Sequence, residues 1–368
     1  MDDEVKVAIL EQKQEVLEQF VQKLDSAIEK IAEVNTNVSK MLAVHEEKIS
    51  KQEALEKYNS VIGVSDVSFD VKPGEIFCVM GLSGSGKSTL VRHINRLLEP
   101  TSGKILVNGQ DVMTLEKEQL QEFRNKKIGM VFQNFALMPH RSVIDNIAMP
   151  LEIRGINKNQ RYDQAYKILN IVELQGWGNK YAHELSGGMQ QRVGLARALA
   201  ADPEVLLMDE PFSALDPLIR RQLQTEFINL SKSMNKTTVF ITHDLDEAVK
   251  VGHRIAIMRD GKVIQIGTPE EIVMKPVDEY VADFVKGISR LKVVEAKTIM
   301  MPIDQYQKNY GKLSNNAIKV SENEILSKLI EYSVKNDAPI IVQDKNLTDI
   351  GAISQKDLLK AAVEGQDD

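Results

Sequence analysis

This sequence has a single cysteine, no long apolar run and no excess of basic residues, and each of these features narrows the class of protein. The 368 residues contain one cysteine, Cys78, so no disulfide can form within the chain and a reducing compartment is expected. No apolar run approaches the roughly 20 residues of a spanning helix, and the N-terminus Met1-Asp-Asp-Glu4 lacks a secretory signal pattern. The net charge is −7 with Lys and Arg scattered, which predicts no nucleic-acid partner. The length predicts two or more domains.

What the sequence does contain is a phosphate-binding loop, GLSGSGKST, directly after the apolar run Glu75-Ile-Phe-Cys-Val-Met80. Glycines let backbone N–H groups point at phosphate oxygens at the start of a helix, which adds its positive end. Lys87 supplies a mobile cation for the β- and γ-phosphates, and the Ser88 hydroxyl can bind Mg²⁺. The strand, loop and helix context favours nucleoside triphosphate binding over an accidental glycine-rich turn. The predicted nucleotide-binding residues of the loop are Gly81, Leu82, Ser83, Gly84, Ser85, Gly86, Lys87, Ser88 and Thr89.

Two further apolar runs, each typical of a buried parallel strand, end in residues that hydrolysis needs. Val205–Met208 leads into Asp209, which we expect to bind Mg²⁺, and Glu210, which we expect to act as general base. Thr237–Thr242 leads into His243. The simpler alternatives are a solvated acidic pair before a proline turn and a structural histidine.

A second predicted anion site follows about a hundred residues after the loop. In Leu185-Ser-Gly-Gly-Met-Gln190, the Ser186 hydroxyl and the amides of Gly187 and Gly188 open a predicted helix over 189–201. With this motif the chain resembles the ATP-binding subunit of an ABC transporter, whose signature reads LSGGQ. Met189 replaces the usual glutamine, although the serine and both glycines that meet phosphate are kept.

The resemblance covers about residues 61–287 and implies roles for further residues. It implies that Gln133 senses Mg²⁺ and the γ-phosphate, that Asp216 bridges two protomers, and that His243 is the switch histidine at the γ-phosphate. It also implies an α/β P-loop NTPase fold, an ABC-type ATP-binding domain over 58–290, with a helical subdomain at about 143–182. Because each motif occurs once, it implies a dimer of two chains enclosing two ATP molecules, with Lys87, Gln133, Glu210 and His243 as catalytic residues and Ser88, Gln133 and Asp209 around Mg²⁺.

Partners and solute are also implied by resemblance. A transporter chain without a membrane segment would dock on a transmembrane permease at the cytoplasmic face of the membrane, and through it meet a solute-binding protein. The expected contact is the segment 134–142, which could instead be an ordinary buried loop. Stretches such as MVFQNFALMPHRSVIDN and DPLIRRQLQ are similar to subunits for glycine betaine and proline betaine uptake. The alternatives are choline, carnitine, trimethylamine N-oxide or amino-acid import, or a non-transport ABC ATPase, or a module with dead catalysis, against which Glu210 and His243 argue.

The two flanks carry separate expectations. Apolar residues at alternating steps of three and four over 1–57 predict a long helix, either in a coiled coil or folded as one amphipathic helix on its own domain. Tyr58 is the candidate for stacking on adenine, on spacing alone. Over 296–368, a β-α-β-β-α order resembles one CBS motif, which implies a regulatory domain, or a dimerisation appendage without a ligand; Lys297–Met300 could begin another motif.

Overall fold

The computed structural model describes residues 22, 23, 26, 51–133, 135–311, 313, 316–336 and 338–363. The chain divides into two compact units, Met1–Ile62 and Gly63–Asp368. In the first unit the helix α2 spans Lys51–Tyr58, within the region expected to be helical. The choice between a coiled coil and a single amphipathic helix for 1–57 falls almost wholly outside the described residues.

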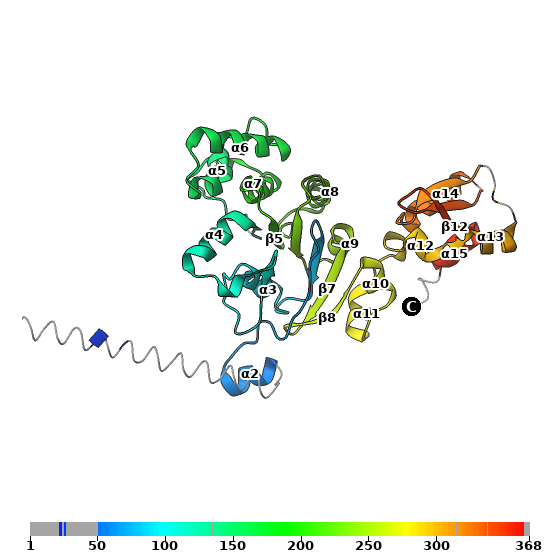
Figure 1. Cartoon of the computed structure of the whole chain (residues 1–368), viewed down its shortest axis with the longest axis horizontal. Coiled ribbons are helices and arrows are strands. Elements are labelled where there is room, and N and C mark those ends of the chain that lie inside the picture. The colour runs from blue at the N-terminus through cyan, green and yellow to red at the C-terminus, as the bar shows by residue number, and fades with distance from the viewer. Residues whose placement is uncertain are drawn as a thin grey trace, which may run out of the picture. The chain divides into compact units, whose positions relative to one another are not determined.

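A six-stranded sheet forms the centre of the second unit, in the order β4-β5-β6-β1-β7-β8 (Figure 1). All neighbouring pairs are parallel except β7 with β8. Because the register pairs Ile241 with both Asp209 and Val79, the carboxyl ends of the three central strands meet at one edge. The strands are β1 Ile76–Met80, β4 Ile128–Val131, β5 Val205–Asp209, β6 Thr237–Ile241, β7 Arg254–Arg259 and β8 Lys262–Gly267.

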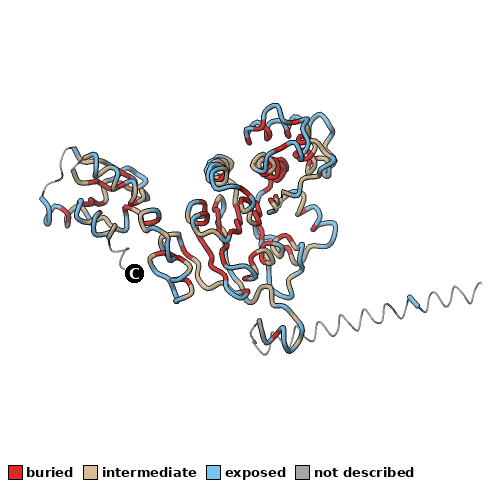
Figure 2. The backbone as a smooth tube through the Cα atoms, turned by 180° about the vertical axis from the view of Figure 1, so that it is seen from behind, coloured by how far each residue is buried: buried red, intermediate tan, exposed pale blue. Residues whose placement is uncertain are grey.

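The strands read as unbroken apolar runs because both faces of the sheet are covered. Ile76, Cys78 and Met80 of β1 belong to one hydrophobic cluster, while Phe77 and Val79 belong to another. This is the alternation that a pleated strand requires. Helices α3 (Lys87–Ile94) and α4 (Lys117–Lys127) contribute to the second cluster, and the five helices from α5 (Val143–Ile153) to α9 (Leu245–Val251) contribute to the first. Figure 2 shows the buried residues following the strands.

Helices follow the strands and cover the sheet. Helices α5 and α6 pack against each other and against α7, which together form a helical group (Figure 1). This group contains the expected helical subdomain at 143–182 and adds α7 to it. The elements are α3 Lys87–Ile94, β2 Leu106–Val107, β3 Gln110–Asp111, η1 Val112–Thr114, α4 Lys117–Lys127, α5 Val143–Ile153, α6 Lys158–Ile171, η2 Ala182–Glu184, α7 Gly187–Ala200, α8 Pro217–Met234, α9 Leu245–Val251, α10 Pro269–Met274, α11 Glu279–Val285 and η3 Arg290–Lys292.

A second sheet of four strands lies in the C-terminal part, in the order β10-β11-β12-β9. The predicted β-α-β-β-α order is confirmed as β10, α14, β11, β12 and α15. The segment proposed to begin another motif instead leads into β9, which pairs with β12 of the same sheet. The elements are α12 Ala296–Ile299, β9 Met301–Pro302, α13 Ile303–Tyr310, β10 Ile318–Ser321, α14 Leu326–Lys335, β11 Ile340–Gln343, β12 Asp349–Ile353 and α15 Gln355–Val363. Among the described residues, no helix has the length and apolar character to cross a membrane.

Candidate functional site

The glycine-rich loop joins β1 to α3; of the nine residues predicted to bind phosphate, Gly81 to Gly86 form the loop and Lys87 to Thr89 form the first turn of α3. Gly81, Gly84 and Gly86 have φ angles of 150°, 78° and 100°, which disfavour any side chain. Space is also short, because a Cβ on Gly81 would lie 2.3 Å from the carbonyl oxygen of Met258 and one on Gly86 would lie 2.1 Å from that of Gly63. The predicted glycine roles therefore have a steric basis.

Lys87 is the first residue of α3, and its side chain is buried within the loop. Its ammonium donates to the carbonyl oxygens of Gly81, at 2.7 Å, and Leu82, at 3.1 Å. Burial lowers the pKa of Lys87, and the carboxylates of Glu210 and Asp209 raise it in opposition. A buried cation held by the backbone of a glycine-rich loop suits a phosphate group. The hydroxyl of Ser85 is also buried, and it has no hydrogen-bond partner among the described residues, so the loop holds one further unmatched donor.

The predicted magnesium ligands Ser88 and Asp209 are in contact. The Ser88 hydroxyl donates to Asp209 Oδ1 at 2.8 Å, across the gap between α3 and the end of β5. Within the described ranges, no group of three or more His, Cys, Asp or Glu side chains could hold a metal ion. A hydroxyl beside one carboxylate nevertheless fits Mg²⁺, because this ion usually keeps several waters and completes its shell with substrate phosphates.

Glu210 contacts two of the other predicted catalytic residues, Gln133 and His243. Its Oε2 accepts from Gln133 Nε2 at 3.3 Å and lies 3.1 Å from His243 Nδ1. Its backbone has a φ of 47°, in the left-handed region, and its N–H donates to the carbonyl of Ile241 at 3.1 Å. That turn directs the carboxylate away from β5 and toward the adjacent strand end. In the described part of the chain the Gln133 amide donates to Glu210 and not to Ser88 or Asp209.

The second predicted anion site is built on the N-terminus of α7. Ser186 is the N-cap, and its hydroxyl accepts from the Met189 N–H at 3.4 Å. Gly188 is required by packing, since a Cβ there would lie 2.7 Å from Ile219 Cγ2 of α8. Ser186 and Gly187 are exposed, so the site faces solvent. It is assembled apart from the phosphate loop, on a different group of helices.

Asp216 caps the neighbouring helix α8. Its Oδ1 accepts from the N–H groups of Leu218, at 3.2 Å, and Ile219, at 3.1 Å. The residue is exposed, so one oxygen of its carboxylate can still meet a partner. Tyr58, by contrast, belongs to the other compact unit of the chain, at the end of α2. Its stacking on adenine therefore stays a prediction.

Two contributors to the site were missed in the sequence. Gly261, in the Asp260-Gly261 turn between β7 and β8, donates its N–H to the Ser85 carbonyl at 3.0 Å and so supports the phosphate loop from outside. The signal was present, because Asp-Gly between two apolar runs is a strong hairpin turn pattern. Arg92 of α3 lies 3.7 Å from Asp209 Oδ2, and nothing in the local sequence distinguishes this arginine from an exposed helical one.

Comparison of this chain with known proteins finds a matching family and several similar relatives. Residues 64–213 match the family described as ABC transporter, and residues 1–60 match one described as a coiled-coil region of unknown function. The glycine betaine transport ATP-binding protein OpuAA of Bacillus subtilis (strain 168) is 48% identical over 313 residues, which are 85% of this chain and 72% of the relative. The glycine betaine/proline betaine transport system ATP-binding protein ProV of Escherichia coli (strain K12) is 50% identical over 281 residues, which are 76% and 70%.

The solved structures agree with the sequence relatives. A dimeric structure of MJ0796, a bacterial ABC transporter cassette, is similar with a TM-score of 0.53 and 34% identity, over 58% of this chain and 93% of that one. The ordered motifs, the phosphate loop facing paired carboxylates, and these relatives show together that this chain belongs to the family of ABC transporter ATP-binding proteins.

Proposed function

We propose that the chain is the ATP-hydrolysing subunit of an ABC importer that takes up a quaternary amine or betaine, such as glycine betaine or proline betaine. One observation supports the catalytic part most directly. The Glu210 carboxylate is held between Gln133 and His243, at the same sheet edge as the buried Lys87 and the Ser88–Asp209 pair. A site with a phosphate cradle, a general base and two groups to orient it suits phosphoryl transfer to water.

Each side chain has a distinct task in this proposal. Lys87 neutralises charge on the β- and γ-phosphates, and the loop amides hold them in place. Ser88 and Asp209 would hold Mg²⁺, which neutralises phosphate charge when bound. Glu210 accepts a proton from the attacking water, while His243 and Gln133 fix the direction of its carboxylate and contact the γ-phosphate side of the site.

A second copy of the chain is the expected partner for the hydrolysis step. The exposed Ser186 and Gly187 at the N-terminus of α7 provide an anion site that lies apart from the phosphate loop of the same chain, and Asp216 is exposed beside it. Two chains facing each other would bring each loop to the other's α7. The similarity to dimeric cassettes supports this arrangement of two ATP molecules between two chains.

The remaining partners follow from the relatives, whose names describe glycine betaine and proline betaine transport. The permease would dock on the segment 134–142, next to Gln133, at the cytoplasmic face of the membrane, and would connect the chain to a solute-binding protein. Import of choline, carnitine, trimethylamine N-oxide or an amino acid is the alternative.

The flanking regions have proposed roles of their own. The β-α-β-β-α order over 318–363 supports a CBS-like regulatory domain that pairs with its copy across the dimer. The match of residues 1–60 to a coiled-coil family supports pairing of the N-terminal helix. Residues 1–57, 58–290 and 296–368 remain our proposed domains.

The test is ATP hydrolysis by the chain reconstituted with its permease in vesicles, with and without glycine betaine and its binding protein, across a salt series. We expect the amine to raise the hydrolysis rate, and a salt dependence would assign the C-terminal domain to regulation. If no amine changes the hydrolysis rate, the assignment as an ATPase stands and the proposed solute is rejected. A Glu210→Gln complex serves as the control for contaminating ATPase.

A further inference from the structure

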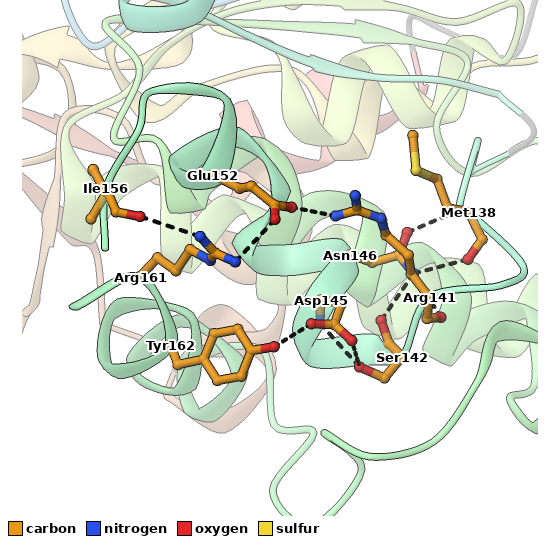
Figure 3. Close-up of polar contacts among 9 residues, drawn as sticks. All are labelled: Met138, Arg141, Ser142, Asp145, Asn146, Glu152, Ile156, Arg161 and Tyr162. Carbon is orange, nitrogen blue, oxygen red and sulfur yellow. Dashed lines mark hydrogen bonds and ion pairs between the residues drawn. The ribbon is translucent and has the colours of Figure 1, made fainter. Parts of the chain in front are cut away.

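The segment that follows Gln133 is tied to α5 by the buried amide of Asn146, beside an Arg141–Glu152 ion pair and a Ser142–Asp145 hydrogen bond. Asn146 is 1% exposed, and its Oδ1 accepts from the Met138 N–H at 2.8 Å (Figure 3). Its Nδ2 donates to the carbonyls of Met138 and Arg141, both at 3.1 Å, and Ser142, at 3.0 Å. One side chain therefore fixes both ends of the turn over 138–142.

The first half of the same segment is tied to α7 instead. Arg197 is 7% exposed, and its guanidinium donates to the carbonyls of Phe135, at 2.8 Å, and Ala136, at 2.5 Å. Burial lowers the pKa of Arg197, and no carboxylate in the described part of the chain offsets this. Peptide carbonyls are the acceptors that compensate this buried cation. Moving the two carbonyls away would leave the buried charge without acceptors, at a cost in free energy, so they are held in place.

The backbone that Arg197 holds is in an unfavourable conformation. Phe135 and Ala136 have φ angles of 57° and 49°, so two successive residues with side chains occupy the left-handed region. Such a conformation persists only where the surroundings impose it. The close approach of Gly194, where a Cβ would lie 3.6 Å from the Phe135 carbonyl oxygen, shows that α7 is the surface against which it is held.

We propose that Arg197 is a positioning residue that locks the segment after Gln133 onto α7, so that a displacement of this segment moves the helix that begins at Ser186. One end of the segment, Gln133, contacts Glu210. Arg197 connects the next residues to the helix whose other end carries the second anion site. The segment therefore links the site of its own chain with the one offered to a second copy. This inference rests on the proposed function for its transport consequence, but the lock itself does not.

The lock is tested by hydrogen exchange on the detached full-length chain. Arg197→Lys keeps the charge but cannot reach two carbonyls, so amides over 135–142, including Met138, should exchange about tenfold faster or more. Arg124→Lys is the matched control, because Arg124 also donates to two carbonyls, those of Asn95 at 2.8 Å and Arg96 at 2.5 Å, far from the segment in sequence. Unchanged exchange over 135–142 in Arg197→Lys, or equal acceleration there in Arg124→Lys, would overturn the lock.

A second variant separates a strained backbone from a general loss of folding. Ala136→Gly makes the left-handed conformation cheap, so in the Arg197→Lys background it should slow the exchange of the segment several-fold. If the double variant exchanges as fast as Arg197→Lys, Arg197 is not holding a strained backbone. Asn146→Asp, which keeps the acceptor for Met138 but removes the donor to three carbonyls, should loosen the turn over 138–142 in the same assay.

The transport consequence is measured in the reconstituted complex. In Arg197→Lys the stimulation of hydrolysis by glycine betaine should fall about tenfold, as expected for the loss of one charged hydrogen bond, while the unstimulated rate of the detached chain changes less than about twofold. Arg124→Lys should keep the stimulation. Full stimulation in Arg197→Lys would overturn the coupling role. If the wild-type complex shows no stimulation by any amine, the proposed solute is wrong. The hydrogen-exchange result then decides alone whether Arg197 holds the segment onto α7.

Discussion

Replacing Glu210 by glutamine tests the catalytic site with the smallest possible change of shape. The carboxylate is only 18% exposed, and one of its oxygens lies 3.1 Å from His243 Nδ1 and 3.3 Å from Gln133 Nε2. An amide of the same size can still accept one of these hydrogen bonds. It cannot accept a proton from water, so the substitution removes the proposed general base and leaves the neighbours in place.

The magnitude follows from that lost role. A positioned general base contributes about 10²- to 10⁴-fold, so the turnover of Glu210→Gln should fall by this factor, or about 3 to 5 kcal/mol in the activation barrier. The affinity for ATP should stay nearly constant, because the Lys87 ammonium is held by the carbonyls of Gly81 and Leu82 and the Ser88 hydroxyl by Asp209. None of these contacts involves Glu210.

The assay combines steady-state hydrolysis with equilibrium ATP binding on the same preparations. Glu247→Gln is the matched control, because Glu247 is also a buried carboxylate near the strand edge, but it accepts from Gln224 at 3.0 Å rather than from His243 or Gln133. We expect Glu247→Gln to hydrolyse ATP at the wild-type rate. Normal turnover in Glu210→Gln, or equal losses in both variants, would refute the role of Glu210 as general base.

Three further predictions concern the loop and the core. Lys87→Ala should weaken ATP binding about tenfold or more, by the loss of a charged hydrogen-bond donor; unchanged affinity in a binding titration would reject the loop assignment. Burial raises the pKa of Glu247, so the free energy of unfolding should decline as pH rises from the ordinary carboxyl range through that raised pKa, and Glu247→Gln should abolish this decline; parallel urea-midpoint curves for both proteins would contradict it. Gly252→Ala would place a Cβ 2.7 Å from Cys78 Sγ and 2.8 Å from the Ala248 carbonyl oxygen, so we expect the free energy of unfolding to fall by about 1 to 3 kcal/mol. An unchanged thermal unfolding midpoint would show that the core rearranges to accept the methyl group.

The strands of the site could be predicted because the sheet is covered on both faces. Val205–Asp209 and Thr237–Ile241 are strands at the places that their apolar runs indicated. The first ends at Asp209, and the second is followed by Thr242 and then His243. Such runs are informative because a buried parallel strand needs apolar side chains at every position. The contact between Ser88 and Asp209, 121 residues apart, follows from the rule that the carboxyl ends of parallel strands meet at one edge.

The supports of the site could not be predicted in the same way. The carbonyl of Ser85 is held by Gly261, and the strained Phe135 by Arg197, through contacts between segments that are distant in sequence. Asp260-Gly261 is recognisable as a hairpin turn, but the turn pattern does not show that it meets the phosphate loop. Arg197 belongs to no local pattern, because an arginine within a helix has the same appearance in the sequence whether it faces solvent or a buried carbonyl. Periodicity gives the face of a helix but not the group that meets it.

The departure at Met189 shows which part of the second anion site depends on side chains. The Ser186 hydroxyl accepts from the backbone N–H of Met189, so residue 189 contributes to the cap through its main chain, whatever its side chain. Its side chain is partly buried and packs against the hydrophobic core. An anion at this helix N-terminus would meet the serine hydroxyl and backbone amides. Methionine in place of glutamine therefore puts an apolar side chain against the core and leaves the serine hydroxyl and the backbone amides available to an anion.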